Sequence, residues 1–257
     1  MVRPVLLLRL EGPLQSWGAR SRWDVRDTQP EPTKSGVVGL LGCALGYPMY
    51  DPRLEAELDA GLRFGVRVES PGRVMEDFQT ITDFLPTAGG GFKHSGVKVA
   101  RSLETLQADP DAVPATILSQ RTYLEDAAFL VALEETDAVP GLLPRCAAAV
   151  QRPAWPIFLG RKACIPTRPI FEALTEEYQD IEDALRRHRW SWLGAHIQNR
   201  RGRGVPSLLP AYVEDPSGLL VRQDAVRVNA ARQYGFRHCR ELQPPVSNSW
   251  AQEGGGA

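Results

Sequence analysis

The chain has 257 residues, of which 43% are hydrophobic and 24% charged, and its formal net charge is −1. This composition is ordinary for a folded globular protein of one large or two small domains, and it excludes a chain that is disordered throughout. The apolar run from Val5 to Leu8 is interrupted by Arg9 and is too short for a secretory signal or a membrane span, so we expect a cytoplasmic protein with no membrane partner.

The first elements that the sequence predicts are a strand and a helix. Residues 2–10 are mostly apolar, and residues 35–45 carry apolar side chains at helical spacing. Thr33 or Ser35 can cap this helix, and its free amides beside Lys34 are suited to binding an anion. A helix that is simply packed against the sheet is the other interpretation.

The loop between these two elements contains aromatic and basic residues. Trp17 could stack an unpaired base and Arg20 could neutralise a phosphate, as in proteins that bind single-stranded RNA. A tryptophan buried beneath the first helix is an equally good interpretation. The loop is therefore a candidate RNA contact.

The middle of the chain predicts a short helix at 51–60, a half-buried strand at 62–69 with alternating apolar residues, and a returning hairpin strand at 73–82. A long insertion follows, over about residues 80–119. Loops of this length inside a compact domain are usually functional or disordered. The insertion contributes three further candidate RNA contacts, which are Lys93, His94 and Arg101.

A strand at 121–133, a helix at 137–150 and a last strand at 153–159 complete the first part of the chain. Together the elements predict an α+β fold that approximates a ferredoxin-like or RRM-type unit. The loop after the last strand contains Gly160-Arg161-Lys162, where glycine could allow close approach of a phosphate and the two cations could pair with it. A solvated turn is the alternative interpretation of these three residues.

The pattern weakens toward the C-terminal end. We expect a helix at 172–189, several short strands through Val228, and a basic loop at 200–204. The organisation that follows is a domain over 1–168, a smaller and irregular β-rich subdomain over 169–240, and a disordered tail over 241–257.

Charge is segregated along the chain. Residues 186–240 contain 11 arginines and three acidic residues, whereas residues 1–185 contain 19 basic and 26 acidic residues. Only four of the 30 basic residues are lysine, and arginine is suited to phosphate and base recognition. The segregation indicates a basic face for an anionic partner, although codon bias could produce the excess of arginine over lysine.

Neither cysteine nor histidine is clustered. Cys43, Cys146, Cys164 and Cys239 form no C-x-x-C pair, so we expect four reduced thiols and no structural zinc. The four histidines are equally scattered, and no phosphate-binding or dinucleotide-binding glycine motif is present. We therefore expect no metal and no cofactor.

Five motifs, in order along the chain, are Leu14-Gln15-Ser16-Trp17-Gly18, Thr33-Lys34-Ser35-Gly36, residues 120–127, residues 156–166 and Arg232-Gln233-Tyr234. With these motifs the chain resembles the CasD family, whose members hold the 5′ handle of the guide RNA (crRNA) in type I-E CRISPR surveillance complexes (Cascade). The resemblance extends over most of the chain.

The resemblance implies a non-catalytic RAMP-type protein in which an RRM-like palm and an inserted thumb grip the handle. It also implies one copy per complex, docked against the backbone subunit CasC and the large subunit CasA beside the other Cascade subunits. Matched by position, the handle contacts would be Lys34, Ser35, Gly36, Gly160, Arg161 and Lys162.

Two alternatives remain open. The related subunit of type I-C systems cuts its guide precursor without a metal, using a tyrosine, a lysine and a histidine, and this chain offers Tyr47, Lys93 and His94 for such a set. A structural adaptor that binds only protein is the second alternative. The steep salt dependence of phosphate contacts distinguishes an RNA-binding protein from such an adaptor.

Overall fold

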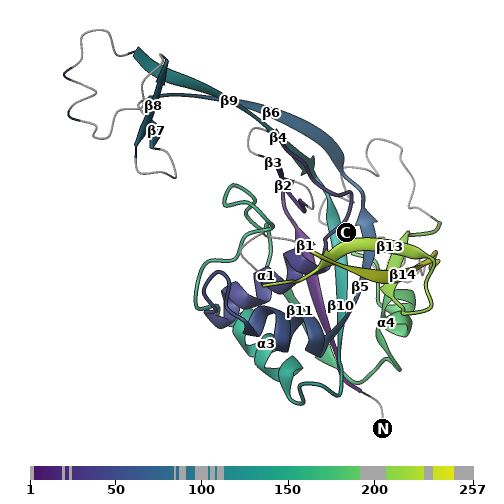
Figure 1. Ribbon diagram of the computed structural model, residues 1–257. Coiled ribbons are helices and arrows are strands. Elements are labelled where there is room, and N and C mark those ends of the chain that lie inside the picture. The colour runs from purple at the N-terminus through teal and green to yellow at the C-terminus, as the bar shows by residue number, and fades with distance from the viewer. Residues whose placement is uncertain are drawn as a thin grey trace.

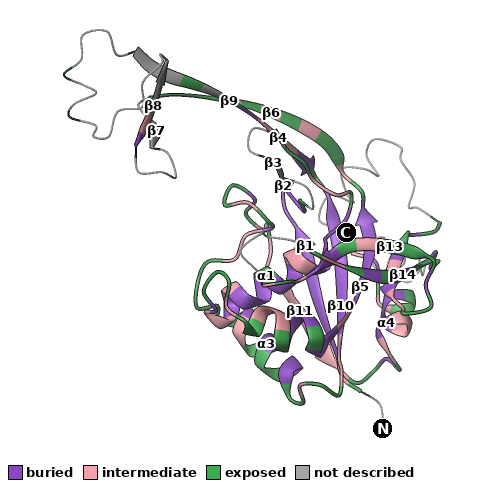
Figure 2. Ribbon diagram, in the orientation of Figure 1, coloured by how far each residue is buried: buried purple, intermediate pink, exposed green. Residues whose placement is uncertain are grey.

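The structure is a computed structural model that describes residues 3–18, 21–22, 25–83, 85–86, 91–95, 104, 108, 113–191, 207–228 and 234–245. A body of sheet and helices carries a long arm of strands that projects away from it (Figure 1). The central strands of the body are buried, whereas much of the described part of the arm is exposed (Figure 2). The arm and the body are therefore stabilised in different ways.

The body contains one seven-stranded sheet in the order β11-β1-β10-β5-β12-β14-β13, with antiparallel neighbours throughout. The strands are β1 (Val5–Glu11), β5 (Leu62–Ser70), β10 (Ala128–Glu135), β11 (Phe171–Thr175), β12 (Ala211–Glu214), β13 (Leu220–Ala225) and β14 (Gly235–Leu242). With its helices the body is a mixed α+β fold, which confirms the predicted class.

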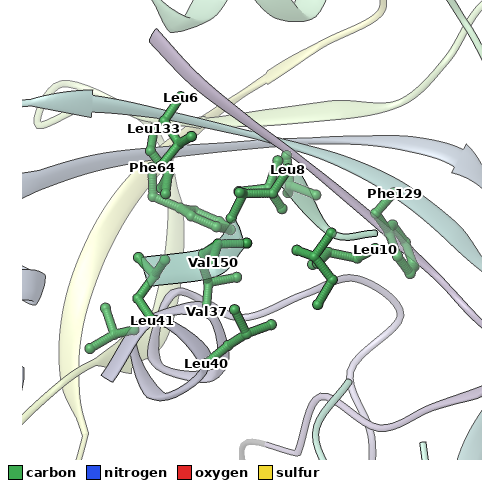
Figure 3. Close-up of a cluster of buried hydrophobic side chains, with 14 of the residues drawn as sticks. Leu6, Leu8, Leu10, Val37, Leu40, Leu41, Phe64, Phe129, Leu133 and Val150 are labelled. Atoms are coloured by element: carbon green, nitrogen blue, oxygen red, sulfur yellow. The ribbon is translucent and has the colours of Figure 1, made fainter. Parts of the chain in front are cut away.

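The helices cover both faces of this sheet. They are α1 (Lys34–Leu45), the π-helix η1 (Leu54–Asp59), α3 (Leu142–Gln151) and α4 (Ile181–Arg187). Leu6, Leu8 and Leu10 of β1 pack in the same cluster as residues of α1 and α3 (Figure 3), whereas Val5 and Leu7 pack with α4. Each leucine that is removed from water contributes roughly 1.5–3 kcal/mol, so β1 is central to both cores.

The strand predicted to be half-buried is buried on both faces. Arg67 and Glu69 of β5 are 2% and 3% exposed, and Arg67 Nε lies 2.6 Å from Glu69 Oε1. Arg67 also donates to the carbonyls of Leu185 and His188 at the end of α4. The prediction of a half-buried strand was wrong, because Arg67 and Glu69 pair with each other inside the protein instead of facing water.

The arm is a ribbon of two long antiparallel strands, β6 (Arg73–Asp83) and β9 (Val113–Glu125). The short strands β7 (Leu85–Pro86) and β8 (Phe92–Ser95) lie at its outer end (Figure 1). At its base β9 also pairs with β2 (Leu14–Gln15) and, in parallel, with β4 (Val25–Arg26), which in turn pairs with β3 (Ser21–Arg22). The expected hairpin between residues 62–69 and 73–82 is wrong, because β6 pairs with β9 instead.

Two other predicted strands differ in the structure. The run at 121–133 is divided between β9 and β10, because the chain turns at Asp126, which has a φ of 55°. Residues 153–159 form no strand and run irregularly beside α1, where Ala154 N donates to Ala44 O. Pro153 and Pro156 lack the amide that a sheet requires.

The predictions for the C-terminal half need similar correction. The helix expected at 172–189 is two elements, the edge strand β11 and the short helix α4, and the helix expected at 137–150 begins only at Leu142. Strand β14 continues to Leu242, so the expected tail does not begin at residue 241. The basic loop at 200–204 and residues 246–257 lie outside the described residues.

The described residues contain no helix that is both long enough and apolar enough to cross a membrane. Among the same residues, no group of three or more histidine, cysteine or acidic side chains is arranged to hold a metal ion. Cys146 is fully buried, and burial raises the pKa of its thiol to about 12.

Candidate nucleic-acid interface

Three hollows meet where α1 begins. The first, which we call the central cleft, has a volume of about 240 Å³ and is lined by Ser16, Trp17, Gly18, Arg26, Thr33, Ser35, Gly36, Gly160, Arg161 and Tyr234. A second hollow of about 260 Å³, beside β13 and β14, shares Thr33 with it. A third of about 270 Å³, which we call the tyrosine pocket, shares Ser35 and Tyr234 with the central cleft.

The structure brings together most of the predicted contacts of the first loop, the helix start and the glycine loop. Ser35, Gly36, Gly160 and Arg161 all line the central cleft, and Lys162 follows directly as an exposed residue. These segments are far apart in the sequence. Their convergence is what the RNA-binding interpretation requires, but the individual side chains have other contacts.

Two amides at the start of α1 are already used within the protein. Thr33 Oγ1 accepts a hydrogen bond of 3.1 Å from Gly36 N, and Asp224 Oδ2 accepts one of 2.8 Å from Lys34 N. Asp224 is itself held by the guanidinium of Arg237 at 2.6 and 2.9 Å. The carboxylate therefore occupies the anion position at the helix N-terminus that we had predicted for a phosphate.

Lys34 turns its charge away from the cleft. Its ammonium lies 3.0 Å from Glu214 Oε2 and 4.0 Å from Asp59 Oδ1, and the side chain is 5% exposed. Burial raises the pKa of Asp59 above its usual value. The geometry does not favour a phosphate contact from the Lys34 side chain, because its charge is already paired.

Trp17 is a core residue. It is 1% exposed, its indole nitrogen donates to Gln15 Oε1 at 3.0 Å, and its ring carbons occupy the space beside Gly36 where a side chain would otherwise lie. The interpretation of a tryptophan packed beneath the first helix is therefore the correct one. Arg20 lies outside the described residues.

The glycine loop is fixed by contacts with the rest of the protein. Gly160 has a φ of 102°, and a Cβ on it would overlap the carbonyl oxygen of Ser16. Arg161 donates to the carbonyls of Thr122 at 3.0 Å and Arg26 at 2.8 Å. Its guanidinium also lies 4.6 Å from the centre of the Tyr123 ring. The loop thus fastens the cleft to the base of the arm.

Tyr123 is 2% exposed and belongs to the hydrophobic core. Five cleft residues were not predicted as contacts, namely Ser16, Gly18, Arg26, Thr33 and Tyr234. Ser16 and Tyr234 lie in motifs that carried the family resemblance, so the signal for them was present. Arg26 had no signal of this kind, because only the pairing of β4 with β9 places it at the cleft.

The residues of the nuclease alternative are not brought together. Lys93 and His94 belong to β8 at the outer end of the arm, whereas Tyr47 directly follows α1 in the body (Figure 1). The Tyr47 hydroxyl contacts Glu57 at 3.1 Å and Arg145 at 2.7 Å. Burial and the hydrogen bond to Glu57 raise the pKa of Tyr47, which opposes a role as a general base. Arg101 lies outside the described residues.

Comparisons with known proteins give consistent results. Residues 5–240 match the profile of the family described as "CRISPR-associated protein (Cas_Cas5)". The chain is 32% identical over 174 residues to "CRISPR system Cascade subunit CasD" of Escherichia coli (strain K12), a match covering 66% of this chain and 70% of that protein.

Two solved structures resemble the whole fold. A chain titled "Crystal structure of Cas protein" is 33% identical with a TM-score of 0.62, covering 94% of this chain and 95% of that one. A chain from "CRISPR RNA-guided surveillance complex" is 29% identical with a TM-score of 0.64, covering 94% and 90% respectively.

Proposed function

The chain belongs to the Cas5 family of CRISPR-associated proteins, as a subunit related to CasD of a CRISPR surveillance complex, and from this membership we propose a specific role for it. It binds the 5′ handle of the crRNA and caps that end of a type I-E complex without cutting the RNA. One copy per complex docks against the CasC backbone subunit and the CasA large subunit.

The observation that carries the proposal is the central cleft. It joins three segments that the sequence separates widely, and both Arg26 and Arg161 line it. Lys162 lies next to it and is exposed. Because guanidinium and ammonium groups neutralise phosphates, such a cleft is suited to the backbone of a single-stranded RNA.

The topology supports the finer description of the fold. Strand β1, helix α1, strands β5 and β10, helix α3 and strand β11 follow one another in the order β-α-β-β-α-β. Their four strands are adjacent in the sheet, in the order β11-β1-β10-β5. We propose that this unit is the RRM-like palm, and that the arm of β6 and β9 is the thumb.

The contacts of the cleft residues decide which substitutions test RNA binding without damaging the fold. Arg161 holds two backbone carbonyls at the base of the arm, so removing it would damage the fold as well as any RNA contact. Arg26 and Lys162 are both exposed, so their side chains can be shortened with little structural cost. The pair R26A and K162A is therefore the better perturbation, with R152A, an exposed arginine at the end of α3, as the matched control.

The experiment measures binding of the full chain to a labelled repeat RNA in EDTA over a range of salt concentrations. We expect binding without cleavage, and a logarithmic affinity that falls with the logarithm of salt by about 0.7 per phosphate contact. The double variant should bind roughly 5- to 150-fold more weakly, equivalent to about 1–3 kcal/mol, while R152A should match the wild type.

Each alternative has its own outcome in this assay. Cleavage of the repeat in EDTA would favour the metal-independent nuclease, which the separation of Tyr47 from β8 does not support. A chain with no measurable RNA affinity at low salt would favour the protein-only adaptor. Equal affinity of the wild type and the double variant would refute the assignment of the central cleft.

A further inference from the structure

The tyrosine pocket lies directly beside the central cleft, on the far side of Ser35 and Tyr234. Its wall is largely apolar and includes Val38, Met49 and Tyr50. Met49, Tyr50 and Tyr234 are 74%, 44% and 36% exposed, so three large side chains face solvent around one hollow. Exposed apolar and aromatic side chains that gather in this way mark binding sites.

We propose that the tyrosine pocket holds one unstacked base of the single-stranded RNA whose backbone lies in the central cleft. This inference rests on the proposed function, and it adds a specific base-binding site to it. Because the two hollows share Ser35 and Tyr234, a nucleotide in the cleft can turn its base into the pocket without leaving the surface.

The chemistry of the wall suits a base. Every base has a flat π-face that stacks on aromatic side chains, and tyrosine provides such a face. Tyr50 has a φ of 67°, a left-handed conformation that is disfavoured for a bulky residue and that tends to occur at binding sites.

The polar edge of a base also finds partners there. Arg227 belongs to the lining, and its Nη1 donates to Val226 O at 2.8 Å and lies 3.4 and 3.9 Å from carboxylate oxygens of Glu55 and Asp59. All three contacts are made through Nη1, so a hydrogen bond from Nη2 to a carbonyl or ring nitrogen of a base would not break them. The hydroxyl of Ser35 stands at the boundary between pocket and cleft.

The pocket can be filled without disturbing the helix beside it. Gly39 of α1 lines the pocket, and nothing lies within 4 Å of the place where its Cβ would be. A larger residue there projects into the hollow and is a better helix former than glycine. Gly39→Leu therefore blocks the pocket while the central cleft keeps all of its lining residues.

The test measures affinity of the full chain for the repeat RNA and for a series of the same RNA with one abasic nucleotide at a time. The variants are Gly39→Leu and Tyr234→Ala, and the matched control is Ala148→Leu, which adds the same side chain to an exposed position of α3. Circular dichroism and thermal melting check that each variant is folded.

We expect Gly39→Leu and Tyr234→Ala each to weaken binding roughly 5- to 150-fold, as for the loss of one stacked base, with Ala148→Leu unchanged. One abasic position should weaken wild-type binding by a similar factor. An abasic nucleotide at that same position should lower the RNA affinity of Gly39→Leu little or not at all, because the leucine already fills the pocket. If Gly39→Leu does not fold, the affinities of Tyr234→Ala and the wild type across the abasic series test the base pocket instead.

The outcomes separate this inference from the proposed function. Salt-dependent binding by the wild type, with both variants and every abasic RNA equal to it, would overturn the base pocket and leave the cleft intact. No binding by the wild type would overturn the proposed function itself. If Gly39→Leu prevents assembly with the protein subunits but keeps its RNA affinity, the pocket holds a partner's side chain and the inference is wrong.

Discussion

Replacing Gly160 by alanine tests whether this glycine is required by packing within the protein. Its φ of 102° lies in the region that L-residues avoid, at a cost of roughly 1–2 kcal/mol. The new methyl group would also overlap the Ser16 carbonyl oxygen and force the two segments apart, which threatens the 3.0 Å hydrogen bond from Ser16 N to Leu159 O. Loss of that bond adds about 0.5–1.5 kcal/mol.

We therefore expect Gly160→Ala to lower the free energy of unfolding by roughly 1.5–3.5 kcal/mol, measured by urea denaturation followed by circular dichroism. Gly39→Ala is the matched control, because its methyl group meets open space on a helix and should raise the free energy by about 0.5–1 kcal/mol. Equal stabilities for the two alanine variants would refute the argument that Gly160 is fixed by its contact with Ser16.

Three further predictions concern the ion pairs and the turn. The hydrogen bond from His188 lowers the pKa of Glu172 to about 2. Glu172→Gln should therefore lower the free energy of unfolding by on the order of 2 kcal/mol above about pH 5, and this deficit should disappear as the pH falls toward 2. Denaturation at several pH values measures it. Lys34→Met should lower the free energy of unfolding by roughly 1–3 kcal/mol, because Glu214 loses the ammonium group that it faces, and adding Glu214→Gln should restore part of that loss. No measurable change in urea denaturation would argue against the buried pair. Asp126→Gly should leave the melting temperature unchanged or raised, whereas Asp126→Val lowers stability by about 1–2 kcal/mol.

The elements that the sequence predicted well have their signals close together. The first helix has its cap at Thr33 and ends at Gly46, both of which are found in the structure. Strand β1 is apolar except for Arg9 and Glu11, and it is buried along its whole length. In these cases the local preference and the tertiary environment agree.

The helix expected at 172–189 failed for the opposite reason. Its apolar residues have helical spacing, but the segment from Phe171 to Thr175 lies against the edge of β1, and pairing there outweighs the local pattern. The helix that does form is capped by Asp180, whose side chain accepts from Asp183 N at 2.8 Å. Aspartate is a residue type that the sequence alone marks as a helix cap.

The candidate site was predicted in outline but not in its contacts. The segments that meet at the cleft could be named from their motifs. The partner of Lys34 could not, because Glu214 follows it by 180 residues. An ion pair that only the fold creates can occupy a side chain that looks free in the sequence, so the structure does not favour Lys34 as a phosphate contact.

The arm can change its length independently of the sheet from which it extends. No residue of β6 is fully buried, so its reach is not set by the packing of a core. Because side chains alternate with a period of two, adding two residues to each strand would carry the outer end about 7 Å further and leave every existing side chain on its own face. An odd insertion would reverse the faces. The strands of homologous arms should therefore differ in length by even numbers of residues, which a survey of related chains can test.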